Sequence, residues 1–392
     1  MNKRVYLLMV VSFIVGMVEL IIGGILDLIA QDLHVSLGQA GMLITIFSLT
    51  FAISGPILLV LTAGYERKRL TMVFLLIFFL GNIVSIFSPT YSVLFISRII
   101  SALSGALLVI LCLIIAPSIV EPKYRGRAIG IVSMGVSGSI VLGLPIGLFL
   151  GDAFSWRAPF VLIAILTIIS MAGVYFFMDK VAPKPSIPLR DQLKTLKNRK
   201  ILFAHITMFL FLAGHTVLYA YFKPFLKTTM GLEGTWVSVI YLIFGIAAVS
   251  GGGFGGAMAD RFGTKRTILL TIAIFGTTLF VIPYTTFTMP LFLIVMVIWG
   301  MMNWSLTPAL QSYLIETSPE TSDIQQSLNN SALHFGIAFG SFIGGMVIEQ
   351  VSVVHNAAVG GMIVILSFGA ALISMFGISS WKKSKTIHRS QK

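Results

Sequence analysis

The chain has 392 residues, of which 57% are hydrophobic and only 10% are charged, and its mean hydropathy of +0.97 excludes a soluble globular domain. A net charge of +13 would suggest nucleic-acid binding in a soluble protein, but here the basic residues lie between apolar runs and report membrane topology. The single cysteine, Cys112, excludes an intramolecular disulfide and a cysteine metal cluster.

Twelve apolar stretches are long enough to cross a bilayer as helices. The first begins directly after Lys3 and Arg4 and is too long for the core of a signal peptide, so we expect it to be retained. The sequence therefore predicts an all-α membrane protein with twelve transmembrane helices. Their expected positions are about 5–27, 39–62, 70–88, 92–119, 126–151, 156–178, 200–226, 235–258, 266–286, 289–315, 323–349 and 355–379.

The basic residues predict the orientation of these helices. When the connecting segments are assigned to alternating sides, 23 of the 27 Lys and Arg residues share the side of both termini, against only Arg157, Lys223 and Lys227 opposite. Cytoplasmic loops carry an excess of positive charge. We therefore expect a multi-pass membrane protein with both termini in the cytoplasm.

One long polar connection, at about 179–199, contains three prolines and divides six spans from six. An offset of 197 residues also superposes Lys68-Arg69 on Lys265-Arg266, and superposes the small-residue series Ser139, Gly143, Gly147 on Gly336, Gly340, Gly344. A parallel repeat of six helices is the natural interpretation. The prediction is an N-terminal bundle (1–178), a cytoplasmic linker (179–199) and a pseudo-symmetric C-terminal bundle with a basic tail (200–392).

Glu19 stands near the middle of the first span, between Gly16 and Gly23, with no other charge between Arg4 and Asp27. A carboxyl group at bilayer depth is neutral when water is excluded and ionises when water or a cation reaches it. Glu19 is therefore our first candidate for proton coupling. The alternative is a permanently protonated or paired glutamate with a structural role.

Arg98 and His215 are the other ionisable candidates for proton coupling. Arg98 lies about six residues inside the fourth span, where a charge costs about 2.5–3.5 kcal/mol to insert and should face protein or water. His215 falls beside Glu19 at the 197-residue offset and shares one helix face with Tyr219 and Phe222. Structural alternatives remain for both: an arginine bound to carbonyls or to a carboxylate, and a hydrogen-bonded core histidine.

Two polar stripes on the tenth and eleventh spans should face inward, because unpaired amides in lipid are costly. Each repeats every four residues, and aromatic side chains beside them offer flat surfaces to a ring-shaped solute. Hydrogen bonding between helices and aromatic packing are the alternatives. The candidate solute ligands are Tyr219, Asn303, Trp304, Thr307, Gln311, Gln326, Asn330, His334 and Phe335.

The segment from Gly256 to Arg266 resembles the G-x-x-x-D-R-x-G-x-[KR]-[KR] signature of the major facilitator superfamily. The resemblance implies that the loop carboxylate pairs with bases and a helix N-terminus and so stabilises one gate conformation. It assigns this role to Asp260, Arg261, Gly263 and Lys265. The first-half copy departs from the signature, with Ala63 in place of aspartate and Glu66 in place of glycine.

Two further stretches resemble helix signatures of the same family. Arg98 to Gly105 is similar to its fourth-helix arginine pattern, which implies proton coupling. Gly143-Leu144-Pro145-Ile146-Gly147 is similar to its antiporter sequence G-P-x-x-G, with one inserted leucine. The resemblance makes Gly143, Pro145 and Gly147 candidate gate residues.

Longer strings, such as Val18-Glu19-Leu20-Ile21, Leu218 to Phe222 and Gln311 to Glu316, resemble bacterial purine base and nucleoside efflux pumps of the twelve-helix drug:proton antiporter group. His334 and Asp27 stand where that pattern has glutamine and proline. The resemblance implies a proton-coupled antiporter that exports small organic solutes by alternating access, with purine bases or nucleosides first. Aromatic amino acids and amphiphilic drugs are alternative solutes, and a non-transporting receptor or lipid-handling protein is an alternative class.

The expected partners are the lipid bilayer, a small solute and protons. We expect no nucleic acid, no metal and no cofactor besides the proton gradient, because the sequence has no phosphate-binding loop after a strand and no metal-ligand cluster. We also find no nucleophile–base arrangement, so the chain is not expected to be an enzyme, and we expect a monomer.

Overall fold

The computed structural model describes residues 3–183 and 188–377, and every regular element in those ranges is a helix. Twelve spans are long and apolar enough to cross a membrane, which confirms the predicted fold class. Helices suit this setting because every backbone N–H and C=O group in lipid must be bonded within the chain.

The N-terminal spans are α1 (Lys3–Asp32), α2 (Leu37–Leu61), α3 (Arg67–Ile86), α4 (Tyr91–Ser118), a fifth span built from α5 (Arg125–Gly138), the π-helix η2 (Ser139–Gly143) and α6 (Leu144–Ala153), and α7 (Ala158–Phe177). The C-terminal spans are α9 (Arg199–Tyr219), α11 (Thr235–Phe262), α12 (Thr264–Val281) with η4 (Ile282–Thr285), α13 (Met289–Thr317), α14 (Ser322–Gln350) and α15 (His355–Phe376). Short helices connect them: η1 (Pro122–Tyr124), α8 (Leu189–Lys194), η3 (Thr195–Lys197), α10 (Phe222–Met230) and η5 (Pro319–Thr321).

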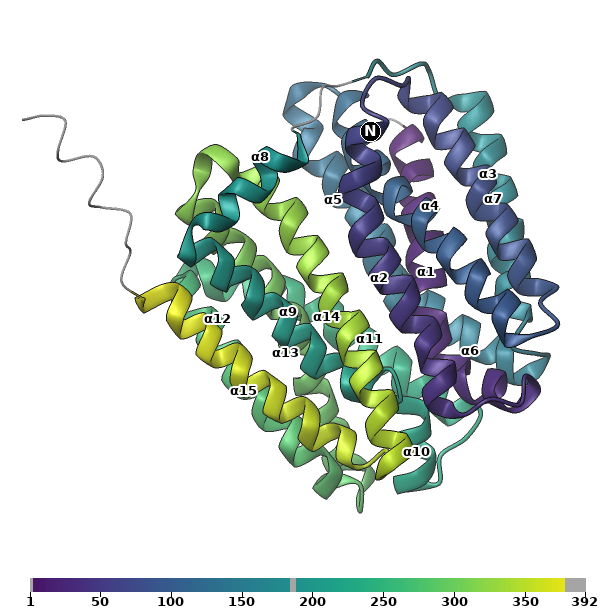
Figure 1. Cartoon of the computed structure of the whole chain (residues 1–392), viewed down its shortest axis with the longest axis vertical. Coiled ribbons are helices and arrows are strands. Elements are labelled where there is room, and N and C mark those ends of the chain that lie inside the picture. The colour runs from purple at the N-terminus through teal and green to yellow at the C-terminus, as the bar shows by residue number, and fades with distance from the viewer. Residues whose placement is uncertain (1–2, 184–187, 378–392) are drawn as a thin grey trace, which may run out of the picture.

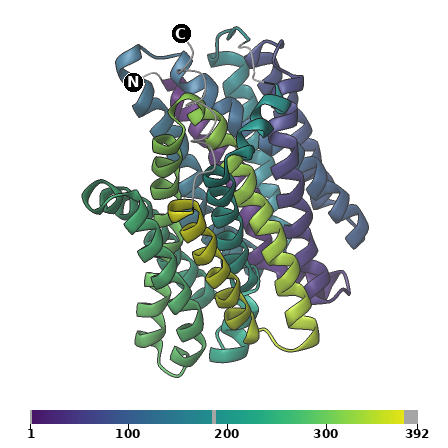
Figure 2. The same ribbon diagram turned by 60° about the vertical axis from the view of Figure 1, so that its left-hand side comes forward.

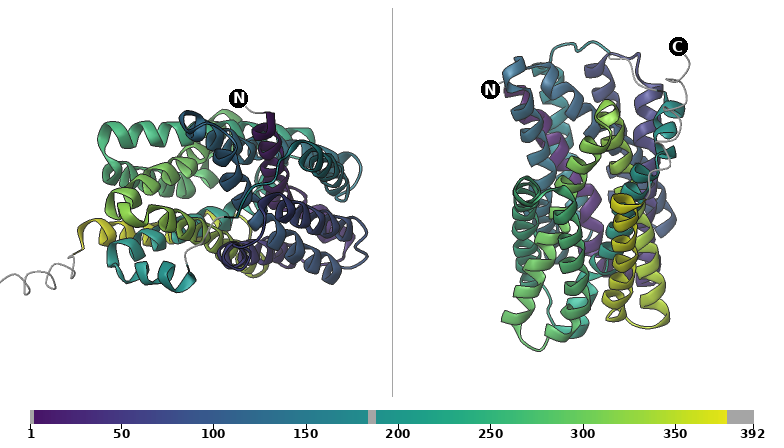
Figure 3. Two further views of the ribbon diagram at one scale, coloured as in Figure 1. Left: turned by 90° about the horizontal axis from the view of Figure 1, so that it is seen from above. Right: turned by 90° about the vertical axis from the view of Figure 1, so that its left-hand side faces the viewer.

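The two groups of six spans form two bundles that stand side by side (Figure 1), as the view from above also shows (Figure 3). Because each bundle crosses an even number of times, the start of α1, the end of α15 and the segment that joins the bundles lie toward one end of the molecule. We call this end the termini side and the other end the far side.

The most extensive contacts between the bundles are made by α14 with α2 and by α11 with the fifth span. Helix α14 runs beside α2 (Figures 1 and 2), where the Ser331 and Ser341 hydroxyls donate hydrogen bonds of 3.1 and 3.0 Å to the carbonyls of Ala52 and Gly41. Helix α11 meets the fifth span so closely that a Cβ on Gly245 would lie 2.8 Å from the Ile140 carbonyl oxygen. Gly41, Ser341 and Gly245 lie on the far-side half of their helices, whereas Ala52 and Ser331 lie about one turn from the middle toward the termini side.

Two spans are interrupted where the sequence analysis expected continuous helices. The expected helix at 200–226 ends at Tyr219, and α10 starts at Phe222. The reason is Pro224, which supplies no N–H and whose ring clashes with the carbonyl four residues earlier. In the fifth span the π-helix immediately precedes Leu144-Pro145, so the leucine inserted into the antiporter-like sequence is accommodated by one wide turn.

Glu66, the residue that departs from the loop signature, caps α3. Its carboxylate accepts hydrogen bonds from the backbone N–H groups of Lys68, Arg69 and Val181 at 2.7, 2.8 and 2.8 Å. Burial alone would raise the pKa of Glu66, but the three backbone donors and Lys180 hold this pKa below its ordinary value. The substitution thus ties the start of α3 to the segment that leaves the first bundle.

Candidate functional site at the junction of the bundles

The two bundles are joined near the middle of the molecule by a carboxylate and an imidazole. Glu19 Oε1 on α1 lies 3.2 Å from His334 Nδ1 on α14, and the two side chains are only 18% and 6% exposed. When His334 carries a proton this contact is an ion pair across the bundle interface. The structure therefore brings together a predicted proton-coupling residue and a predicted solute ligand.

Aromatic rings connect this pair to Arg98. The ring centroids of His334 and Phe51 lie 4.2 Å apart, Phe51 stacks near Phe47, and the Arg98 guanidinium lies 4.2 Å from the centre of the Phe47 ring. Arg98 is fully buried, and within the described part of the chain none of its guanidinium nitrogens has a hydrogen-bond partner. Its counter-charge is Glu19, which acts on it through space. If Glu19 bound a proton, the buried charge of Arg98 would lose its counter-charge, which costs free energy. The protonation of Glu19 therefore depends on whether another charge enters the site.

Helix packing holds Glu19 in place. A Cβ on Gly147 would lie 2.0 Å from Ile21 Cδ1, and a Cβ on Gly143 would lie 3.3 Å from Met17 Cβ, so both glycines allow α1 to pack closely on the fifth span. Pro145 is buried one residue inside α6. Gly143 and Gly147, two of the three predicted gate residues, thus line the contact that orients α1.

His215 lies in a second cluster, within the C-terminal bundle. Its ring centroid is 4.8 Å from that of Tyr219 and 5.3 Å from that of Trp299, and Asn303 Nδ2 donates to its Nε2 over 3.4 Å. The sequence analysis named His215, Tyr219 and Asn303 but missed Trp299 and Phe244, which pack on the same ring. Trp299 precedes Asn303 by one helical turn, and that spacing was a usable signal.

The polar stripe on α14 faces the N-terminal bundle, because His334 belongs to it and reaches α1 and α2. Gln326 and Asn330 lie on the same face toward the termini side and are exposed. Phe335 lies on a neighbouring face, is 37% exposed and is not part of the Glu19 cluster. On α13, Trp304, Thr307 and Gln311 are half-buried.

The loop signature lies on the termini side, between α11 and α12. Gly263 adopts a φ of +85°, which favours glycine, and forms the turn between the two helices. Asp260, Arg261 and Lys265 are exposed, and among the described residues none of the three takes part in an ion pair. The gate role that the resemblance gives to Asp260 stays a prediction.

Twelve spans in two bundles, with ionisable side chains buried where the bundles meet, have the architecture of a membrane transporter. The family model of the Major Facilitator Superfamily matches residues 8–341, and the chain belongs to this family.

The relatives are bacterial transport proteins. The chain is 36% identical over 370 residues to the uncharacterized MFS-type transporter YbcL of Bacillus subtilis (strain 168), covering 94% of this chain and 95% of YbcL. It is 28% identical over 389 residues to the inner membrane transport protein YdhP of Escherichia coli (strain K12), covering 98% of both. Among solved structures, the human organic anion transporter MFSD10 (TETRAN) matches with a TM-score of 0.69 and 14% identity, covering 94% of this chain and 98% of that one, which shows a shared fold.

Proposed function

We propose that this protein is a proton-coupled antiporter of the bacterial cell membrane that exports small organic solutes, with purine bases and nucleosides as the first candidates. The observation that carries the proposal is the contact between Glu19 and His334, which joins the two bundles at the depth of a candidate solute site. The proton gradient is its only energy source, and no cofactor is needed.

Protonation of this pair changes the attraction between the bundles. With Glu19 ionised and His334 protonated, opposite charges meet across the interface at 3.2 Å. A proton on Glu19 removes that attraction and leaves Arg98 and His334 as two uncompensated cations. In a low dielectric, the interaction energy of two opposite charges at this distance differs by several kcal/mol from that of two like charges. This difference is large enough to shift the equilibrium between two arrangements of the rigid bundles. The energy of proton entry is thereby available to drive the conformational change.

The surroundings of the pair suit a flat, polar ring. Phe47 and Phe51, both buried in this conformation, bring aromatic rings to the pair, and the exposed Gln326 and Asn330 supply donors and acceptors on the same face of α14 as His334. The excess of basic residues on the termini side supports a cytoplasmic assignment for that side. Because the bundles touch on the far side, this conformation suits loading of solute from the cytoplasm. Aromatic amino acids and amphiphilic drugs present similar rings and are the alternative solutes.

Transport into inverted membrane vesicles tests the proposal. We expect labelled adenine or guanosine to accumulate only when a pH gradient is imposed, with tyrosine and a cationic dye as the alternative solutes. Absence of gradient-driven accumulation for every solute tested would favour a receptor or lipid-handling protein and overturn the proposal.

A variant isolates the coupling step. Glu19→Gln keeps the size and the hydrogen bonding of the side chain but does not bind a proton. We expect it to lose gradient-driven accumulation by about 100-fold or more while solute exchange without a gradient continues. Glu320→Gln, which neutralises an exposed carboxylate in the loop before α14, is the matched control and should transport normally. Normal accumulation by Glu19→Gln would remove this residue from the mechanism.

A further inference from the structure

A second buried charge cluster joins the bundles on the far side. The Lys223 ammonium lies 2.8 Å from Asp152 Oδ1 and 3.1 Å from Asp27 Oδ1. The Lys223 side chain is only 7% exposed, and the carboxylates are 18% and 23% exposed for Asp27 and Asp152. Both carboxylates belong to the N-terminal bundle and the lysine to the C-terminal bundle. The three charges therefore meet only while the bundles are in contact on this side.

The break in the seventh span places the lysine. Because Pro224 ends α9 early, the chain leaves the axis of that helix, and α10 packs against α1 instead. Lys223 is the second residue of α10 and its side chain points across the interface. Helix α1 is also non-ideal nearby, with φ −115° and ψ 15° at Ile25. Two irregular segments from different bundles thus bring Asp27 and Lys223 together.

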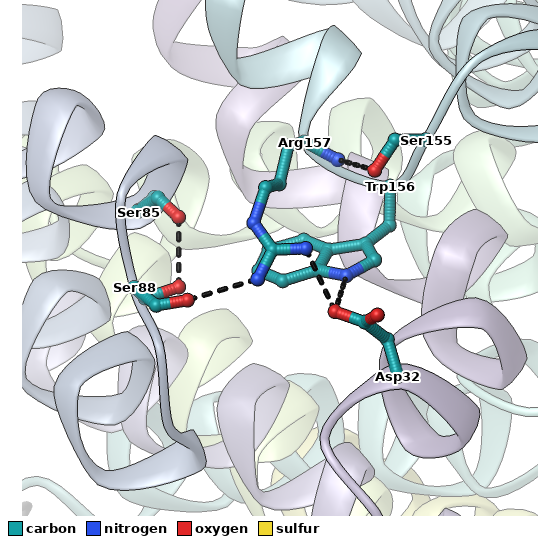
Figure 4. Close-up of polar contacts among 6 residues, drawn as sticks. All are labelled: Asp32, Ser85, Ser88, Ser155, Trp156 and Arg157. Atoms are coloured by element: carbon teal, nitrogen blue, oxygen red, sulfur yellow. Dashed lines mark hydrogen bonds and ion pairs between the residues drawn. The ribbon is translucent and has the colours of Figure 1, made fainter.

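A separate network around Asp32 connects the ends of the two helices that carry these carboxylates (Figure 4). Arg157 Nη1 donates to Asp32 Oδ2 over 2.7 Å, its Nη2 donates to the Ser88 carbonyl over 2.9 Å, and Trp156 Nε1 donates to the same Asp32 oxygen over 2.8 Å. Asp32 follows Asp27 on α1, and Trp156 follows Asp152 just beyond α6. The ends of α1 and α6 are therefore held at a fixed separation. This separation lets the carboxylates of Asp27 and Asp152 bind the same Lys223 ammonium.

We propose that Lys223, held between Asp27 and Asp152, is the latch that closes the far side of the transporter. The inference rests on the proposed alternating-access function and adds a gate that neither the loop signature nor the family assignment supplies. A buried ammonium without its carboxylates is strongly disfavoured, so closure is stabilised as long as all three charges remain together. Opening of the far side separates them.

The structure also shows how the separated charges would be hydrated. A cavity of about 350 Å³ lies against Asp27, between the end of α1, the start of α2 and α10, and its lining includes Gln31, Lys227 and Thr228. Apolar side chains, among them Ala30, Val35 and Leu37, supply most of the wall, but the cavity is large enough to hold water against the Asp27 carboxylate. When the three charges separate, water in this space can therefore hydrate Asp27.

A neighbouring ion pair provides the matched control. Lys227 lies on the same short helix as Lys223, but its Nζ pairs with Glu233 Oε1 at 2.7 Å, within the same bundle. Both side chains of this pair are more than half exposed. Lys227 also lines the cavity beside Asp27, but its ion pair lies within its own bundle. Lys227→Gln therefore removes the same charge from the same helix without removing a member of the buried cluster.

Distances between spin labels test the latch. Labels on Thr90→Cys and Thr288→Cys, exposed positions that precede α4 and α13 on the far side, report the separation of the bundles, and the buried Cys112 stays unlabelled. In detergent, Lys223→Gln should raise the ratio of the long-distance to the short-distance population about tenfold, a change of about 1.4 kcal/mol. The double variant Asp27→Asn/Asp152→Asn should do the same by removing the partners. Lys223→Arg and Lys227→Gln should keep the wild-type distribution.

Two results would overturn the latch: a wild-type distance distribution in both the Lys223→Gln protein and the Asp27→Asn/Asp152→Asn protein, or an equal shift in Lys227→Gln. If one of the variants does not fold, the other decides, because they remove opposite charges. The measurement needs no solute and no gradient. A shifted distribution in a protein that transports nothing would refute only the proposed function, and unshifted distances in an active antiporter would refute only the latch.

Discussion

The two buried charge clusters that join the bundles differ in the kind of charge they hold. Near the middle, Glu19 meets the imidazole of His334 beside an arginine that lacks hydrogen-bond partners among the described residues. On the far side, the ammonium of Lys223 sits between two carboxylates. Imidazoles are common proton carriers in proteins, so the contact between Glu19 and His334 suits the proposed coupling to protons, whereas an ammonium held by two carboxylates suits holding a conformation. We therefore infer different roles for the two clusters: proton coupling for Glu19 and His334, and closure of the far side for Lys223 and its two carboxylates.

After Glu19→Gln, the largest effect is expected from removing the imidazole of the central cluster. His334→Gln keeps a hydrogen-bonding side chain but holds no charge, so the interface with Glu19 no longer responds to protonation of the ring. We expect accumulation to fall about tenfold or more, and the pH profile of the remaining rate to flatten. The measurement is the pH profile of solute exchange in vesicles.

His205 is the matched histidine for this experiment. It is also buried, but its Nε2 lies 3.0 Å from Gln325 Oε1 within the C-terminal bundle. His205→Gln should keep the wild-type pH profile. A profile that flattens equally in both variants would show that loss of any buried imidazole has this effect, and the contrast between the two clusters would fail.

A smaller effect is expected in a double-mutant cycle on the far side. Replacing Lys223 by Gln and Asp152 by Asn, singly and together, should give a coupling free energy of about 0.5–3 kcal/mol in unfolding titrations in micelles. The same cycle on Lys227 and Glu233 should give a clearly smaller coupling, because both side chains are exposed. Equal couplings would mean that burial does not distinguish the latch from an ordinary surface pair.

For the central cluster, the sequence predicted which residues are functional candidates but did not predict which of them are in contact. Glu19, Arg98 and His334 stood out because charged or polar groups are rare at bilayer depth, and that rarity can be read from composition alone. Pairing Glu19 with His334 required knowing how the bundles dock. The repeat offset pointed to His215 instead, because it relates equivalent positions in the two halves and does not identify residues in contact.

The far-side cluster was missed for a different reason. Lys223 was counted only as a basic residue of a loop, although the proline that follows it already predicted a break in the span. Asp27 was noted only as a departure from the purine-pump pattern. Where a helix stops, and therefore which way the next residue points, depends on backbone sterics that an apolar-stretch analysis does not include.

The smallest effect is expected for the exposed pair of Lys227 and Glu233, which serves as the solvent-exposed reference for the buried Lys223 cluster. The hydrogen bond and charge of Lys227 hold the pKa of Glu233 below its ordinary value, and Glu233 in turn raises the pKa of Lys227. A lowered carboxylate pKa stabilises the fold above the unfolded-state pKa, and this stabilisation is lost as pH falls through the folded-state pKa. Since both groups are exposed, about 1 M salt should return the pKa of Glu233 toward normal, as should Lys227→Gln.

Carboxyl carbon NMR of glutamate-labelled protein measures that titration, and distances between the spin labels at positions 90 and 288 measure the latch in the same salt series. Salt should move the Glu233 titration while leaving the distance distribution of the wild-type protein unchanged, because the Lys223 cluster is shielded from ions by burial. If salt opened the far side as readily as it screened the surface pair, solvent would already reach Lys223 in the closed state. The Lys223 cluster would then contribute nothing to closure of the far side, and the packing of α2 on α14 alone would keep the bundles together.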